Sequence, residues 1–166
     1  MSKDCEARTS QANAKRSAFE FIEEAVKNQI ARLMPYLLLL ISAVLASWGI
    51  LGLLEYFVSG VVLGLQNEKF PTGLQFLHFF SILVTGAVFI IGYAKRWPYT
   101  PFATIGMYAI LATLCFIETV DFDAFGGGPT RFIPMTIEYI VYLALSAYLL
   151  RSSTMRDRFH LGSELA

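Results

Sequence analysis

Four ionisable side chains stand inside otherwise apolar stretches of this sequence. Glu55, His78, Glu118 and Glu138 each occupy a different predicted membrane span. An ionisable group in hydrocarbon costs on the order of 3 kcal/mol or more, so such groups tend to pair, face other helices or line a polar cavity. We therefore hypothesise that these four residues form a shared polar chamber.

The depths of the four residues agree with this hypothesis. With a rise of about 1.5 Å per helical residue, His78 lies roughly 10 Å and Glu138 roughly 8 Å from the outer ends of their spans. On the same measure, Glu118 lies roughly 8 Å from Asp123, and Glu55 roughly 14 Å from Gly64. All four are therefore expected at a similar level in the outer leaflet.

Such a chamber suits several kinds of chemistry. Carboxylates with a histidine could bind a divalent metal, relay protons, or hydrogen-bond the polar head of a lipid-soluble molecule such as a quinone. Tyr139 and Tyr142 are secondary candidates because they lie near Glu138. A purely structural alternative stays open, since glutamates near a membrane boundary reach interfacial water and a buried glutamic acid can cross-link helices. Quinone is the one cofactor suggested, and no metal site is assigned.

Composition indicates where these spans reside. The chain has 166 residues, of which 55% are hydrophobic and only 16% charged. Soluble domains carry closer to a quarter charged residues, and apolar runs of about 20 residues match the hydrocarbon core of a bilayer. Acidic and basic residues balance, which gives no reason to expect a nucleic-acid partner.

The apolar runs predict an all-α membrane protein with four transmembrane helices in an up-down bundle. The membrane domain should cover residues 34–151, with spans at about 36–64, 71–93, 101–120 and 133–150. Short connections make consecutive helices antiparallel neighbours. A cytoplasmic tail should follow over residues 152–166.

The segment before the first span has its own character. Residues 1–11 are polar and are expected to be disordered, whereas residues 12–33 show apolar positions at three- and four-residue spacing. This predicts an amphipathic cytoplasmic helix that lies on the membrane surface or docks on a partner. Pro35 is expected to end or bend it.

Basic residues gather at alternate ends of the predicted spans. One side would hold Lys15, Arg16, Lys27, Arg32, Lys95, Arg96, Arg151, Arg156 and Arg158, and the other only Lys69 and Arg131. Lys and Arg close to spans are retained in the cytoplasm. We therefore expect both termini to be cytoplasmic, in a bacterial inner (plasma) membrane.

Small residues in the first span predict close helix contacts. Gly49 with Gly52, and Gly60 with Gly64, would let another helix approach the backbone. No phosphate-binding loop, nucleophile elbow or zincin motif occurs in the sequence. The chain is therefore not expected to be an enzyme on its own.

The second and fourth spans carry a family resemblance. Residues 84–96, VTGAVFIIGYAKR, place two glycines before a basic turn, and Gly126 to Gly128 precede a fourth span that opens with Ile137, Glu138 and Tyr139. This arrangement resembles the DoxX-like membrane proteins over roughly residues 48–150.

The resemblance implies a four-helix bundle and membrane redox chemistry, since some members are associated with it, including a quinone-linked thiosulfate oxidation subunit. The matching positions are Gly86, Gly92, Arg96 and Glu138. The sequence departs from the family pattern at Glu55, where a basic residue is common, and at His78, where the second span often carries a glutamate.

Three functions remain open from the sequence. The first is an accessory or anchoring subunit of a membrane complex, respiratory or redox, which binds other membrane subunits or copies of itself. The second is a redox subunit whose chamber handles a quinone or a metal. The third is a small ion transporter or channel, which would require an oligomer.

Overall fold

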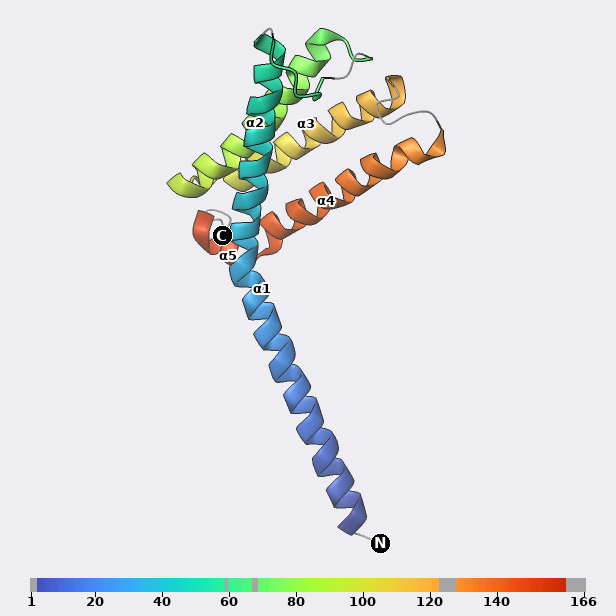
Figure 1. The fold of residues 1–166 in the computed structure, drawn as a ribbon. Helices are drawn as coiled ribbons and strands as arrows, with labels where there is room; N and C mark the ends of the chain where they lie inside the picture. The colour runs from blue at the N-terminus through green and yellow to red at the C-terminus, as the bar shows by residue number, and fades with distance from the viewer. Residues whose placement is uncertain (1–2, 59, 67–68, 123–127, 161–166) are drawn as a thin grey trace. The chain divides into compact units, whose positions relative to one another are not determined.

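The structure is a computed structural model that describes residues 3–58, 60–66, 69–122 and 128–160, with side chains from Gln29 onward. Every regular element in these ranges is a helix (Figure 1). The chain divides into two compact units, Met1–Leu37 and Leu38–Ala166, and the candidate site lies wholly in the second.

Four helical segments are long and apolar enough to cross a membrane. They are Gln29–Phe57, Thr72–Lys95, Thr100–Asp121 and Pro129–Arg151, with mean hydropathies of 2.4, 2.1, 1.7 and 1.5. At about 1.5 Å per residue, each is long enough for a hydrocarbon core of roughly 30 Å. Over the described residues, the prediction of an all-helical chain with four helices long and apolar enough to span a membrane is therefore confirmed.

Helix α1, Lys3–Phe57, differs from its predicted boundaries at both ends. It includes most of the segment expected to be disordered, and it continues through Pro35 rather than ending there. A proline removes one backbone hydrogen bond, whereas the leucine-rich run that follows strongly favours a helix. The helix then ends at Phe57, seven residues before Gly64, the predicted end of the first span.

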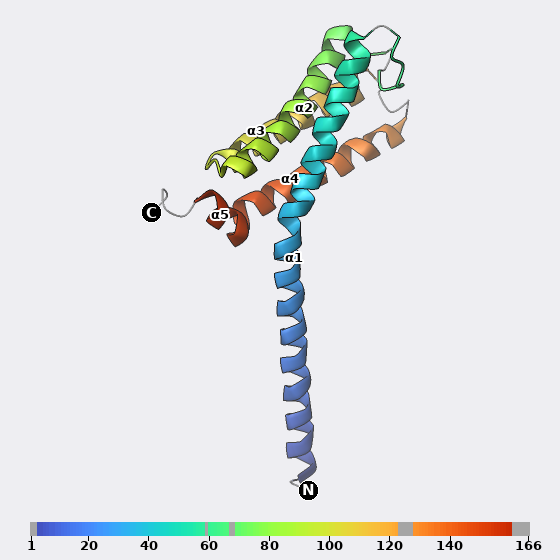
Figure 2. The ribbon, with the colours of Figure 1, turned by 60° about the vertical axis from the view of Figure 1, so that its left-hand side comes forward.

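Three further helices form most of the membrane part: α2 (Thr72–Lys95), α3 (Thr100–Asp121) and α4 (Phe132–Arg151), the last preceded by a short 3-10 helix, η1 (Pro129–Arg131). Helix α2 packs along α3, and α3 packs along α4, as both views show (Figure 1, Figure 2). Part of the predicted glycine-rich connection, residues 123–127, lies outside the described residues, as do Glu68 and the end of the tail.

Glycines bring α1 and α2 into backbone contact. A methyl group placed at Gly49 would lie 2.6 Å from the Leu83 nitrogen, and one at Gly86 would lie 2.4 Å from the Ser42 carbonyl oxygen. The predicted close contact at Gly49 and Gly52 is confirmed, because Gly52 likewise lies against the Phe79 ring. Gly60 and Gly64 instead follow the helix in open space, with φ values of +101° and +72°, so their predicted role in helix packing is wrong.

Helix α5, Ser153–Phe159, occupies part of the segment expected to be a simple tail. Its Met155 and Phe159 are fully buried and join a core cluster with Leu38, Phe89 and Leu149. Arg158 stacks over the Tyr93 ring, 3.9 Å from its centroid, and donates a hydrogen bond to the Tyr93 carbonyl. The chain after α4 therefore packs against the end of α2.

Candidate functional site

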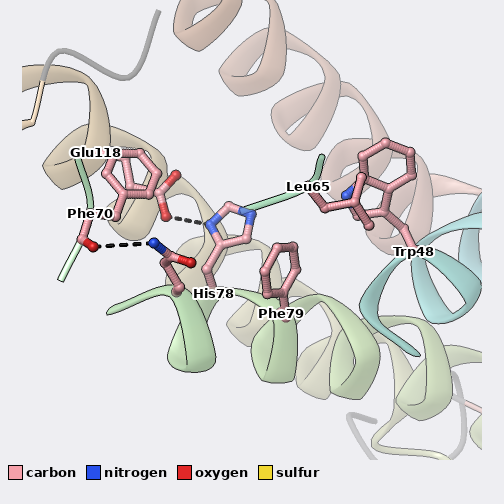
Figure 3. A pocket seen from close by; sticks show the side chains of 7 residues that line it. Trp48, Leu65, Phe70, His78, Phe79 and Glu118 are labelled. Atoms are coloured by element: carbon pink, nitrogen blue, oxygen red, sulfur yellow. Dashed lines mark hydrogen bonds and ion pairs between the residues drawn. The ribbon is translucent and has the colours of Figure 1, made fainter. Parts of the chain in front are cut away.

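A carboxyl-imidazole contact joins α2 to α3. His78 Nδ1 lies 2.5 Å from Glu118 Oε1, and the side chain of Glu118 is only 6% exposed (Figure 3). His78 shares its face of α2 with Ile82, and Glu118 shares its face of α3 with Cys115 and Leu111, because residues three, four and seven apart align on a helix. The sequence therefore directs both ionisable groups into the same interhelical space, where each offsets the burial of the other.

A cavity of about 400 Å³, which we call the chamber, adjoins this pair. Glu138 and Tyr142 of α4 line it as well, and the Tyr142 hydroxyl donates a 2.5 Å hydrogen bond to Glu138 Oε1. Residues 138 and 142 are one helical turn apart, which lets the two side chains meet. The full lining is Val44, Leu45, Trp48, His78, Ile82, Leu111, Cys115, Glu118, Glu138 and Tyr142.

A second, smaller cavity of about 100 Å³ also adjoins the pair (Figure 3). Here the walls include Leu65 and Phe70, from the chain between α1 and α2, and Gln75, whose amide donates to the Phe70 carbonyl at 3.1 Å. We call it the outer cavity. Trp48, His78 and Glu118 line both cavities, so the ionisable pair stands where the chamber and the outer cavity adjoin.

Three of the four predicted chamber residues are thus brought together: His78, Glu118 and Glu138. Glu55 lines neither cavity. Its carboxylate accepts hydrogen bonds from the backbone N–H groups of Leu63, Gly64 and Leu65, at 3.0, 2.9 and 2.9 Å. Because α1 ends at Phe57, Glu55 lies in the last turn of the helix. Its carboxylate therefore holds residues 63–65 of the following chain close to the helix end.

The secondary candidates take different roles. Tyr142 belongs to the chamber, whereas the Tyr139 hydroxyl donates to the Ala112 carbonyl at 2.9 Å and so cross-links α4 to α3. Arg96 follows the last turn of α2 in the left-handed conformation, with φ of 52°, and its neighbour Trp97 donates back to the Gly92 carbonyl. Arg96 therefore acts as the C-terminal cap of α2 and lines neither cavity.

Sequence reasoning named four of the ten residues that line the chamber, and Trp48 and Cys115 are the two missed residues whose side chains carry a polar group. Trp48 forms part of both cavity walls, and Cys115, which is 3% exposed, lies one turn before Glu118 on α3. The spacing of Cys115 from Glu118 was a usable signal, since residues three apart share a helix face. Trp48 had no comparable signal, because its place depends on how α1 is rotated about its axis.

The chamber combines hydrogen-bonding groups with apolar walls. Carboxyl groups of Glu118 and Glu138 accept, while the Tyr142 phenol and the His78 ring donate or accept. Among the described residues, no group of three or more His, Cys, Asp and Glu side chains is arranged to hold a metal ion. The arrangement is suited to hold a small polar ring or headgroup between helices.

No protein-family model matches the chain, and comparisons with curated proteins and with solved structures give no match.

Proposed function

We propose that this protein binds the polar head of a quinone-type molecule in the chamber, as a subunit of a membrane redox complex. The observation that carries the proposal is that two polar pairs line one cavity of about 400 Å³ within the spanning helices: the imidazole-carboxyl contact of His78 with Glu118, and the hydrogen bond from Tyr142 to Glu138. Placing an ionisable side chain in a transmembrane helix costs free energy, and such residues commonly line the binding sites and the proton or ion pathways of membrane proteins.

The chemistry of the walls fits both forms of such a ligand. Quinone carbonyls accept hydrogen bonds, which the His78 ring can donate. The Tyr142 hydroxyl, which donates to Glu138, would donate to a quinone carbonyl by turning from Glu138 to the ligand. Quinol hydroxyls donate, and the carboxyl groups of Glu118 and Glu138 can accept. Val44, Leu45, Ile82 and Leu111 supply apolar surface for the ring faces.

Trp48 offers a direct test because it lines the chamber. The chain has two tryptophans, so a Trp97→Phe variant leaves Trp48 as the only indole. We expect menadione, a tailless quinone that quenches indole fluorescence, to quench this variant saturably in detergent. The matched Trp48→Phe variant retains Trp97, which lines neither cavity, and should show only the linear quenching of a quinone dissolved in the micelle. Equal, unsaturable quenching in both variants would refute the proposal.

A hydroxyl deletion tests the assignment of the site. We expect Tyr142→Phe to weaken menadione binding by about tenfold, since a net hydrogen bond contributes on the order of 1 kcal/mol and a tenfold change corresponds to about 1.4 kcal/mol. Tyr148→Phe is the matched control, because Tyr148 is on the same helix and lines neither cavity. Equal affinities for the two variants would place the ligand elsewhere.

The orientation in the membrane is also a proposal. We propose an up-down bundle in a bacterial inner membrane, with both termini in the cytoplasm. Two observations support it: basic residues gather at alternate span ends, and Arg158, after α4, contacts Tyr93 at the end of α2. A cysteine placed at Lys69 should react with an impermeant maleimide from outside intact cells, and one at Arg156 should not. The reverse pattern would invert the topology.

The resemblance to DoxX-like proteins adds to the support for this proposal. Of the matching positions, Glu138 lines the chamber, whereas Gly86 and Gly92 allow close contacts with α1 and with Thr100. We propose that the chain shares the four-helix arrangement and quinone-linked role of that family. His78 would then be a feature of this chain's own chamber.

A second candidate function is that of an accessory or anchoring subunit with no ligand of its own. It is favoured by α1, whose helix begins at Lys3, well before the first span at Gln29. We propose that residues 12–33 form an amphipathic face that docks on another membrane subunit. Deletion of residues 3–28 should release the partners that co-purify in mild detergent but leave menadione binding intact. If the deletion variant co-purified with the same partners as the full chain, the accessory-subunit function would be refuted.

A further inference from the structure

An apolar groove lies between α3 and α4. Its volume is about 290 Å³. Each helix contributes positions spaced three, four and seven apart, so one stripe of each helix faces the groove. Its walls include Tyr108, Ala109, Ala112, Tyr142, Leu143 and Ser146.

Small residues keep this groove open. Ala109, Ala112 and Ser146 have too little volume to fill the space between the two helices. The tyrosines nearby are already engaged: Tyr139 donates to the Ala112 carbonyl, and Tyr108 stacks on Tyr142 with ring centroids 5.0 Å apart and planes 11° from parallel. These contacts hold the three tyrosine side chains at the walls of the groove.

The groove adjoins the chamber through a single side chain. Tyr142 lines both spaces, and its hydroxyl points to Glu138 in the chamber while its ring stacks on Tyr108 in the groove. Leu143, at the groove, is 71% exposed and Ala109 is also exposed. In a membrane these positions would meet lipid, so the groove faces the bilayer at Leu143 and Ala109 and shares the Tyr142 side chain with the chamber.

We infer that the groove between α3 and α4 holds the hydrocarbon tail of the molecule whose polar head occupies the chamber, with Tyr142 at the junction. This inference rests on the proposed function. It narrows the ligand class to quinones with an isoprenoid or alkyl tail, which reach the chamber from the bilayer.

The side chain of Tyr142, which the groove shares with the chamber, points to the occupant rather than the apolar walls themselves. A tail leaving lipid for an apolar groove gains little hydrophobic free energy, because lipid chains are as apolar as the groove. The groove must therefore act by shape: it gives the tail a path out of the chamber, between two helices that otherwise pack together. A molecule without a tail needs no such path.

Two quinones and a groove-filling variant test the inference. Menadione carries no tail, and a menaquinone with a short isoprenoid tail carries the same ring. In the Trp97→Phe background, Ala112→Phe places a large side chain beside the junction. We expect it to weaken binding of the tailed quinone by at least about tenfold, equal to about 1.4 kcal/mol, and to change menadione binding less than about twofold.

Controls separate the groove from the fold and from the chamber. Ala147→Phe adds the same bulk to an exposed position of α4 that does not line the groove, and should affect neither quinone. If the Ala112→Phe variant still binds menadione, it is folded. If it no longer binds menadione, Ser146→Phe is used as the groove-filling variant instead. Tyr142→Phe should weaken both quinones alike.

Each outcome is decisive. Equal effects of the groove variants on both quinones, or no effect on either, would overturn the groove assignment and leave the chamber proposal standing. No saturable quenching by either quinone in the Trp97→Phe protein would overturn both. A change in oligomeric state caused by Ala112→Phe but not Ala147→Phe, with tailed-quinone binding intact, would assign the groove to a second copy instead.

Discussion

The imidazole of His78 and the carboxyl group of Glu118 meet at 2.5 Å between α2 and α3, two helices long and apolar enough to span a membrane. This contact places the two ionisable groups side by side, so that each offsets the cost of burying the other. Removal of either partner leaves the other ionisable group among apolar side chains with no polar group to offset the cost of its burial. The pair is therefore a structural link between the helices as well as a wall of the chamber.

We expect Glu118→Ala to lower the free energy of unfolding by about 1 to 3 kcal/mol, less than for a fully buried pair, because the His78 side chain that remains is 28% exposed. The double variant His78→Phe with Glu118→Leu should recover most of that loss, because apolar replacement of both partners removes the uncompensated group. Unfolding by a denaturing detergent, followed by circular dichroism, measures both. A double variant less stable than Glu118→Ala would show that the pair does not account for the loss.

The contact between α1 and α2 should tolerate no side chain at Gly86. A methyl group there would lie 2.4 Å from the Ser42 carbonyl oxygen, so Gly86→Ala forces the helices apart and should cost about 1 to 3 kcal/mol. Gly106→Ala, on α3, is the control because nothing lies within 4 Å of its added methyl group, and a better helix former should be neutral or stabilising. Equal melting temperatures for the two variants would contradict this account.

Glu55 should hold the chain that follows α1 without affecting the chamber. Loss of its carboxylate frees the N–H groups of Leu63, Gly64 and Leu65. We expect Glu55→Ala to speed amide hydrogen exchange at these three residues, while leaving exchange in α2 and the affinity for menadione unchanged. Faster exchange throughout α2 and α3 would instead give Glu55 a global role.

Phe159 should anchor α5 to the membrane helices. It is fully buried beside Leu38 and Met155, so Phe159→Ala leaves a cavity and should cost about 3 kcal/mol. Leu150→Ala is the control, since Leu150 is 45% exposed and should cost far less. The melting temperatures of the two variants measure this difference. Similar decreases in melting temperature would mean that Phe159 does not hold α5 in place.

Much of the fold could be predicted because span length and hydropathy are properties of the sequence itself. Two properties could not be predicted: the residue at which a helix ends, and the rotation of each helix about its own axis. Depth alone placed Glu55 with His78, Glu118 and Glu138, but that reasoning assumed that the first span continued to Gly64, whereas α1 ends at Phe57. Depth also says nothing of which way a side chain faces, which is why Trp48 was missed.

Helix α5 escaped prediction for a different reason. Its sequence, STMRDRF, is mostly polar, and its two buried residues, Met155 and Phe159, are only one helical turn apart. A single apolar pair is too short a pattern to distinguish a docked helix from a tail. Its position depends on a core built by residues far away in the chain, such as Leu38 and Phe89.

The glycine contacts between α1 and α2 differ in what they touch, and this sets how the protein can change over evolution. Gly86 faces the backbone of α1, which no second substitution can remove, so this position should be invariant among descendants of the chain. Gly52 faces the ring of Phe79, which a smaller residue can replace. Lineages that acquire alanine at position 52 should therefore also acquire a smaller side chain at position 79. No such compensating substitution is possible for position 86.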